Sequence, residues 1–311
     1  MSSIGGLEGA PPSPPSTAPR GTWNAPRHAD PHLLTGIGLR APHVDEIMAT
    51  RPPVGWLEVH PENYMGAGAA LSTLETLRQH YPIALHGVGL SVGRADALDD
   101  RHLGRLRALV DRLVPVIVSE HLAWSAFEGS YLNHLLPLPY TEESLAIVCR
   151  HVDRVQERLG RTVLIENPAS SLRFRHSTLD EPEFLGELAR RTGCGVLCDV
   201  NNIHVSAHNL GLDPRAYLDA LPASAVREIH LAGHAVNGAG EETVLVDDHG
   251  SPVTEEVWAL YRQALARFGH LPTLVEWDTN IPALPVLLAE AARADAVRGD
   301  SAVVDPDARA A

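Results

Sequence analysis

The chain has 311 residues, of which 44% are hydrophobic and 21% are charged, as in a soluble globular protein. Its formal net charge of −14 argues against a nucleic-acid surface, because phosphate binding is driven by clustered cations. All 25 basic residues are arginine. The absence of lysine excludes Schiff-base aldolases, pyridoxal enzymes, P-loop NTPases and protein kinases.

The cellular location can be argued from what the sequence lacks. No apolar stretch approaches the ~18 residues that a transmembrane helix needs. The first residues, MSSIGGLEGAPPSPPSTAP, have neither the basic start nor the apolar core of a secretory signal. The three cysteines form no CxxC pair and are too few for a disulfide framework. We therefore expect a cytoplasmic protein that contacts neither membrane nor nucleic acid.

The two ends of the chain differ in composition from the middle. Residues 1–31 are rich in Pro, Ser and Gly and are expected to form a disordered tail. Residues 299–311 are small and polar, and we expect the same of them. Residues 32–298 would then form one catalytic domain, whose length suits an α/β barrel.

Between the tails, short aliphatic runs alternate with helical patterns. The runs are typical of buried parallel strands, and they begin at Gly36, Trp56, Ile83, Val116, Val163, Gly195, Val226 and Thr273. Residues 100–113 and 255–268 show apolar side chains at three- and four-residue spacing, and a capping pattern at Thr141 starts a further helix. Eight strands alternating with eight helices predict a (β/α)8 TIM barrel. An open doubly wound sheet is the alternative, but GIGLRAPHVDE matches its nucleotide-binding turn poorly.

Titratable or amide side chains close most of these runs or follow them closely. The carboxyl ends of all strands in a parallel barrel lie on one face, so these side chains would meet in one pocket. Buried and unpaired there, each would cost several kcal/mol, and metal coordination is the ordinary way to hold such a cluster. The sequence therefore predicts a metal site. The predicted ligands are His86, His121, Glu166, Asp199, Asn202, His230, Asp247, His249 and Glu276.

The ligand types suggest how ions would share these side chains. Glu166 and Glu276 are natural bridges, because the two oxygens of a carboxylate can serve two cations about 3.5–4 Å apart. His86 and His121 would complete the site of one divalent transition metal ion.

Further ions would use the remaining side chains. Asp199 and His230 would bind a second ion. Asp247 and His249 are two residues apart, so in an extended loop both side chains point the same way and can hold a third ion. Asn202 would add a weak carbonyl ligand there. Spacing alone leaves the division among three ions open.

Several longer motifs carry a family resemblance. They are GIGLR, WLEVHPENYMG, LHGVGLSVG, SEHLAWS, LLPLPYTEESL, IENPASSL, DVNNIHVSAHN, IHLAGHA and VEWDTNIP. Over about residues 35–290 the chain resembles the multinuclear non-haem iron-dependent oxidative enzymes. More distantly, it is similar to the xylose isomerase-like and endonuclease IV-like TIM barrels. Asn202 replaces the histidine of the endonuclease branch, which favours the iron oxidase branch. His204 and Pro61 depart from the family pattern at the expected pocket rim.

The resemblance implies a function. The family includes the methanobactin-type enzyme that converts peptide cysteines to oxazolone–thioamide pairs. The implied reaction is an O₂-dependent oxidation of cysteine in a ribosomally synthesised precursor peptide. The implied cofactor is two to three iron ions, and the implied partners are the Cys-containing peptide and a small protein that presents it.

Other polar residues near the strand ends are candidates for catalysis. Glu58, His60 and Asn63 on the second strand, with Asp278 on the eighth, would transfer protons or support the ligands. A salt bridge to an arginine explains Asp278 equally well.

Three other functions remain possible from the sequence. A three-zinc endonuclease IV-like phosphodiesterase fits the ligand order, although the net charge and Asn202 weigh against it. A metal-dependent sugar isomerase or epimerase would need two divalent ions and no redox chemistry. A non-catalytic barrel that uses metal for stability fits the open, mixed ligand set least well.

Overall fold

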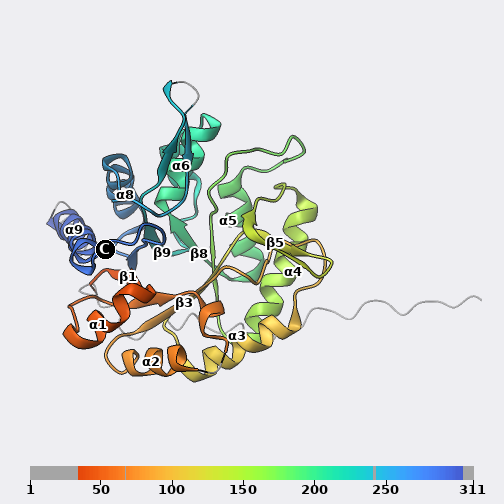
Figure 1. Ribbon diagram of the computed structural model, residues 1–311. Coiled ribbons are helices and arrows are strands. Elements are labelled where there is room, and N and C mark those ends of the chain that lie inside the picture. The colour runs from red at the N-terminus through yellow and green to blue at the C-terminus, as the bar shows by residue number, and fades with distance from the viewer. Residues whose placement is uncertain (1–33, 67, 241–242, 304–311) are drawn as a thin grey trace, which may run out of the picture.

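Eight parallel strands close into a barrel in the order β1-β12-β9-β8-β7-β4-β3-β2. The computed structural model describes residues 34–66, 68–240 and 243–303 (Figure 1). The barrel strands are β1 (Gly36–Gly38), β2 (Leu57–Val59), β3 (Ile83–Gly87), β4 (Val118–His121), β7 (Leu164–Glu166), β8 (Gly195–Asp199), β9 (Val226–Leu231) and β12 (Thr273–Val275). These are the eight runs that the sequence predicts, so the TIM-barrel fold is confirmed.

Helices surround the strands, as Figure 1 shows. They are α1 (Val44–Thr50), α2 (Ala69–Leu77), α3 (Asp100–Leu113), α4 (Glu142–Leu159), α5 (Glu181–Thr192), α6 (Val200–Leu210), α7 (Pro214–Ala220), α8 (Glu255–Phe268) and α9 (Leu284–Val303). Thr141 caps α4 in a reciprocal capping box with Ser144, and the helices predicted at 100–113 and 255–268 are α3 and α8. Local capping and helical periodicity therefore predicted these elements correctly.

Some elements add to the simple alternation. Two hairpins, β5 (Trp124–Phe127) with β6 (Ser130–Leu136) and β10 (Ala235–Asn237) with β11 (Val244–Val246), follow β4 and β9. Helix α9 continues past residue 299, the expected start of the second tail. The first tail and residues 304–311 lie outside the described residues. Within the described ranges, no helix combines the length and apolar character needed to cross a bilayer.

The interior of the barrel changes from apolar to polar along the strands. A buried cluster of Trp56, Ala84, Ile117, Leu164, Leu197 and Leu274 fills its lower part. Successive inward-facing positions on a strand are two residues apart, so the next inward side chains stand toward the carboxyl ends. On β2, β3, β7, β8 and β12 these are Glu58, His86, Glu166, Asp199 and Glu276. The strand period thus places an apolar floor under a set of polar side chains, four of which are predicted metal ligands.

Candidate metal centre

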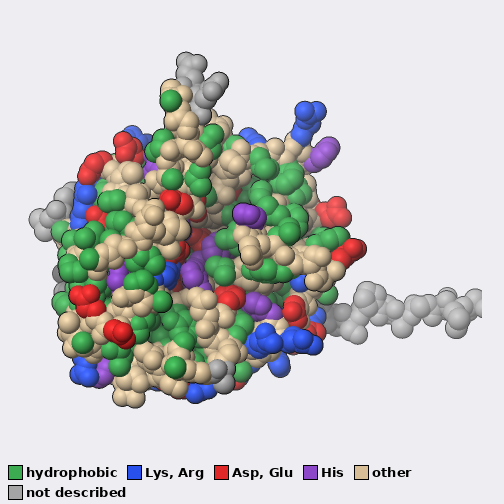
Figure 2. Space-filling model, viewed as in Figure 1, with side chains coloured by type: hydrophobic (Ala, Val, Ile, Leu, Met, Phe, Trp, Pro, Cys, Tyr) green, Lys and Arg blue, Asp and Glu red, His purple; other side chains and the backbone are tan. Residues whose placement is uncertain are grey.

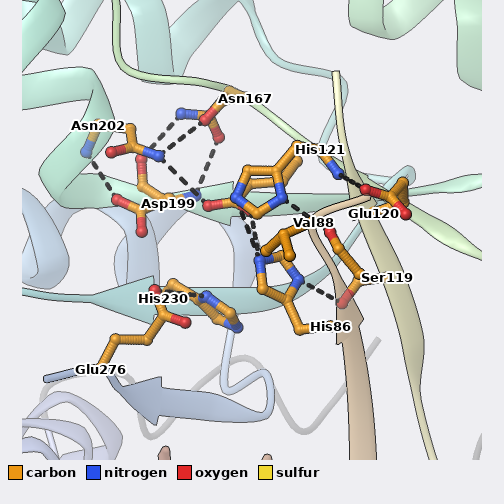
Figure 3. A network of polar contacts seen from close by, with 12 residues as sticks. His86, Val88, Ser119, Glu120, His121, Asn167, Asp199, Asn202, His230 and Glu276 are labelled. Carbon is orange, nitrogen blue, oxygen red and sulfur yellow. Dashed lines mark hydrogen bonds and ion pairs between the residues drawn. The ribbon is translucent and has the colours of Figure 1, made fainter. Parts of the chain in front are cut away.

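The predicted ligands meet at the mouth of the barrel. In Figure 2, histidines and acidic side chains gather in a hollow near the centre of the face. Figure 3 shows His86 and His121 pointing toward one another, with Asp199, His230 and Glu276 beside them. The prediction that far-separated strand ends share one pocket is therefore confirmed.

Three side chains from β3, β4 and β7 form the tightest group. The Nε2 atoms of His86 and His121 are 3.3 Å apart. Oε2 of Glu166 is 2.9 Å from the first and 3.1 Å from the second. Ligand atoms bonded to one ion at ~2.0–2.2 Å are separated by about these distances. The three atoms can therefore bind one transition metal ion without rearrangement.

The opposite nitrogens of the two imidazoles are both anchored. Nδ1 of His86 lies 2.8 Å from the Ser119 hydroxyl, and Nδ1 of His121 lies 2.9 Å from the Gly87 carbonyl oxygen. A carbonyl only accepts, so Nδ1 of His121 donates and its Nε2 keeps the lone pair. Fixing the tautomer through the second nitrogen is the usual arrangement of a metal-bound histidine.

A second group lies on the far side of Glu166. Atoms of Glu166, Asp199 and His230 approach within 4.8 Å of one another, as do those of His86, His230 and Glu276. Nδ1 of His230 is 3.5 Å from Oε2 of Glu276. The ligand side chains of both groups are almost fully buried, apart from His121 of the first group, which is partly exposed. Glu166 belongs to both groups, which suits the bridging position that the sequence predicts for it.

The predicted ligands Asp247 and His249 lie beside this second group. Nε2 of His249 is 2.7 Å from Oδ1 of Asp247, and its Nδ1 is 3.3 Å from Oε2 of Glu276. The Asn201 amide donates to Asp247, and its oxygen lies 2.8 Å from Nδ1 of His234. Asp247 and His249 are therefore brought together as predicted, and Asn201 orients the aspartate.

The predicted ligand Asn202 contacts the bridging glutamate. Its Nδ2 donates to Oε1 of Glu166 at 3.3 Å and to the Asn167 carbonyl at 3.1 Å. Its buried Oδ1 has no hydrogen-bond partner. The free oxygen is the atom that an amide offers to a cation.

Unsatisfied buried atoms mark the centre of this pocket. Side-chain atoms at the barrel mouth with neither solvent contact nor hydrogen bond include Glu166 Oε2, Asp199 Oδ2, Asn202 Oδ1, His230 Nδ1 and His249 Nε2. Buried polar atoms are normally paired, because each orphan costs about 1–3 kcal/mol. All of these atoms belong to predicted ligands, so the donor set fits bound cations.

The pKa values of the ligands show the same excess of negative charge. Burial alone would lower the pKa of His86, but the Glu166 carboxylate outweighs it and the pKa rises to about 10. Burial raises the pKa of Asp199 well above its ordinary value, and the nearby Glu166 and Asp247 add to this shift. Both shifts favour the protonated forms of these groups when no ion is bound.

The four predicted catalytic residues lie at different depths. Glu58 is buried 3.6 Å from Nε2 of His230, and neither of its carboxylate oxygens has a hydrogen-bond partner. His60 lies at the rim, with Nδ1 3.1 Å from the His86 carbonyl and Nε2 3.9 Å from Asp278. Asn63 is exposed on the short 3-10 helix Pro61–Tyr64, and no contact with the cluster is found for it within the described residues.

Asp278 makes both of the contacts that the sequence left open, a salt bridge to an arginine and a contact with a predicted ligand. It accepts from Nε of Arg40 at 2.6 Å, and its other oxygen is 3.3 Å from Nδ1 of His249. The salt bridge to an arginine and the support of a ligand are therefore one arrangement.

Sequence reasoning missed the residues that act through the ligands. Arg40 is half-buried beside Asp278 and Glu276, although its motif GIGLR was already visible. Ser119 and Glu228 each stand two residues before a predicted histidine ligand, so the strand period could have placed both inside the barrel.

Comparison with known proteins places the chain in a family. A model described as "RiPP precursor modification enzyme MbnB/TglH/ChrH" matches residues 34–298. The chain belongs to this family. Its members modify the precursors of ribosomally synthesised and post-translationally modified peptides (RiPPs), and the family resemblance predicted from the motifs is confirmed.

Two similar curated proteins share the family designation UPF0276. A UPF0276 protein of Vibrio parahaemolyticus is 49% identical, covering 86% of this chain and 93% of its own length. A UPF0276 protein of Caulobacter vibrioides is 51% identical, covering 84% and 94%. The match therefore extends over nearly the whole of these relatives.

Solved structures share the fold. The 3-keto-D-glucoside 4-epimerase of E. coli aligns with a TM-score of 0.55 and 12% identity, over 86% of this chain and 99% of that one. Endonuclease IV of Thermus thermophilus aligns with a TM-score of 0.54 and 18% identity, over 88% and 100%. At such low identity the likeness shows the xylose isomerase-like and endonuclease IV-like barrel alone.

Proposed function

We propose that this protein is a multinuclear iron-dependent oxidase that modifies cysteine residues of a ribosomally synthesised precursor peptide with O₂. The observation that carries the proposal is the set of buried, unpaired ligand atoms around Glu166. Membership of a RiPP-modifying family supplies the substrate class. The proposed location is the cytoplasm, and the proposed partners are the peptide and a small protein that presents it.

The donor set suits iron. Imidazole nitrogens and carboxylate oxygens bind divalent iron and, unlike a closed four-cysteine site, leave coordination positions open. His86, His121 and Glu166 would hold one ion, while Glu166, Asp199, His230 and Glu276 would hold a second. Asp247, His249 and Asn202 would hold a third, which would share Glu276 with the second. Bound iron would supply an open position for a substrate thiolate and would pass electrons from the peptide to O₂.

The protons that the reaction removes from the peptide need an acceptor, and residues at the rim can provide one. A four-electron oxidation removes four electrons and four protons from the peptide, and O₂ takes up both to leave as two waters. The Nδ1 hydrogen of His60 is held by the His86 carbonyl, so its Nε2 lone pair is free to accept a proton. Arg40 fixes Asp278, which stands 3.9 Å from Nε2 of His60 and would stabilise the protonated imidazole by its negative charge.

The burial of the centre determines which substrates can reach it. Glu166, Asp199 and Glu276 are at most 2% exposed, whereas His60 and Asp278 are partly exposed at the rim. A thiol side chain projecting from an extended peptide is slender enough to reach past the rim. Glu58 lies beneath His230 and is better placed to tune the ligands than to touch the peptide.

Metal analysis combined with a peptide assay tests the proposal. The chain is purified without O₂, its metals are counted, and it is then mixed with O₂ and the short Cys-containing peptide encoded beside its gene. We expect two to three irons per chain and a peptide lighter by four hydrogens. Glu181→Gln, a carboxylate substitution outside the ligand cluster, serves as the matched control and should keep the metal content and activity of the wild type. Stoichiometric zinc with phosphodiesterase activity would overturn the proposal.

A further inference from the structure

One carboxylate inside the barrel stands where most other strands carry an apolar residue. Two residues before the inward ligand, β3, β7, β8 and β12 carry Ala84, Leu164, Leu197 and Leu274. Strand β9 instead carries Glu228 two residues before His230, and Glu228 is 0% exposed. Burying a charge at this depth is costly unless it has a partner.

Strand β4 supplies the precedent for such an exception. Ser119 stands two residues before His121, where an apolar side chain is otherwise found, and it contacts Nδ1 of His86 (Figure 3). A polar residue in this layer can therefore bind the imidazole nitrogen that does not face the metal centre. Its hydrogen bond to the histidine, and not packing, explains why the strand departs from the apolar pattern here.

Glu228 makes the same kind of contact with His230. Oε1 of Glu228 lies 3.4 Å from Nε2 of His230 in hydrogen-bonding geometry. The other ring nitrogen, Nδ1, has no hydrogen-bond partner and is 3.5 Å from Oε2 of Glu276, on the side of the predicted ligands. A carboxylate accepts hydrogen bonds, so this contact keeps the single hydrogen of a neutral imidazole on Nε2.

We propose that Glu228 is a positioning residue that keeps the ring hydrogen of His230 on Nε2 and so presents the Nδ1 lone pair to the metal centre. The inference rests on the metal centre of the proposed function, but not on iron or on O₂. In the opposite tautomer an N–H group would face the ligands and exclude an ion. Outer partners of this kind typically change metal affinity about 10–100-fold.

The tautomer can be read directly by nuclear magnetic resonance. The full chain, with ¹⁵N-labelled histidine, is loaded with Zn²⁺, which is diamagnetic and takes nitrogen and oxygen ligands. The signals of His230 are assigned by comparison with His230→Gln. We expect a protonated Nε2 and a metal-bound Nδ1 in the wild type. A metal-bound Nε2 would overturn the proposal.

Two variants test the consequence for metal affinity. Glu228→Leu introduces the residue that neighbouring strands carry. It should weaken the binding of one zinc ion about 10–100-fold and leave the affinity for the ion at His86 and His121 unchanged. Glu228→Gln still accepts a hydrogen bond and should recover most of the affinity. Wild-type affinity in Glu228→Leu would overturn the proposal. If that variant does not fold, the wild-type spectrum decides.

The result separates this inference from the proposed function. A protonated Nε2 in a protein that binds zinc but oxidises no peptide would support the role of Glu228 and contradict the oxidase. A wild-type chain that binds neither zinc nor iron would contradict both.

Discussion

Two acidic regions of this molecule differ in whether their carboxylate oxygens have hydrogen-bond partners. At the start of α5, both oxygens of Glu181 are satisfied, by the hydroxyl of Tyr140 at 2.6 Å and that of Tyr217 at 2.5 Å. At the barrel mouth, Oε2 of Glu166 and Oδ2 of Asp199 have no hydrogen-bond donor. Protein groups satisfy the oxygens of the first region, whereas the second has unpaired oxygens in clusters that could hold metal ions. The contrast separates the satisfied carboxylate of Glu181 from the predicted ligands Glu166 and Asp199.

The largest expected effect is the loss of the bridging glutamate. Glu166→Ala removes the oxygen shared by two groups of ligands, so two ions should be lost together, along with activity. Glu276→Ala should do the same, whereas Asp247→Ala should lose only one ion. Metal counting on anaerobically purified variants checks this. Equal losses from all three variants would rule out the bridging role.

Removing the rim histidine should affect catalysis without affecting the metals. His60→Ala deletes the proposed proton acceptor and should lower turnover about 10²–10⁴-fold. Metal content should stay at the wild-type value, because the contact of His60 with the cluster is to a backbone carbonyl and to Asp278. Parallel assays of peptide turnover and metal content test this. A variant that loses both would make His60 a ligand.

The barrel mouth should respond to pH in opposite ways with and without metal. In the metal-free protein the pKa of His86 rises from 6.5 to about 10, despite burial, because of Glu166. Its contribution to stability is therefore complete below pH 6.5 and is lost as the pH rises to about 10. Metal affinity should instead increase with pH, up to about tenfold per unit for each displaced proton. Thermal unfolding and metal titrations check both trends, and a metal-free protein that gains stability over this window would contradict the account.

A smaller effect is expected at the satisfied carboxylate. Glu181→Gln replaces charge-assisted hydrogen bonds with neutral ones and should lower the free energy of unfolding by about 1 kcal/mol. Its metal content should not change. Chemical denaturation measures the stability loss, and any loss of bound ions would show that the two regions are coupled.

The smallest effect is expected at the exposed amide. Asn63→Ala should change stability by no more than about 0.5 kcal/mol, as surface substitutions usually do. Turnover close to wild type would remove Asn63 from the candidate catalytic residues. A large fall in turnover with unchanged stability would restore it.

Strand periodicity predicts most of the metal centre from the sequence. Each barrel strand is short and aliphatic, and in a parallel barrel its carboxyl end can lie only at the mouth. That rule alone brings together His86, Glu166 and Glu276, which are far apart in the chain. The ligand identities thus follow from local patterns and one topological fact.

The partners of the ligands could not be predicted in the same way. The period shows which face Glu228 occupies, but not which nitrogen of His230 it contacts. The link from Arg40 through Asp278 to His249 joins three distant segments, and only the closed barrel brings them into contact. Orientation within the site depends on side-chain geometry, which sequence spacing does not contain.

Anomalous diffraction at the iron edge, on crystals grown without O₂, tests the central claim most directly. The account predicts at least two peaks within bonding distance of Glu166, one beside His86 and His121 and one beside His230 and Glu276. It also predicts no peak near Glu181. Ordered water instead of anomalous scatterers among the unpaired atoms of the barrel mouth would contradict it.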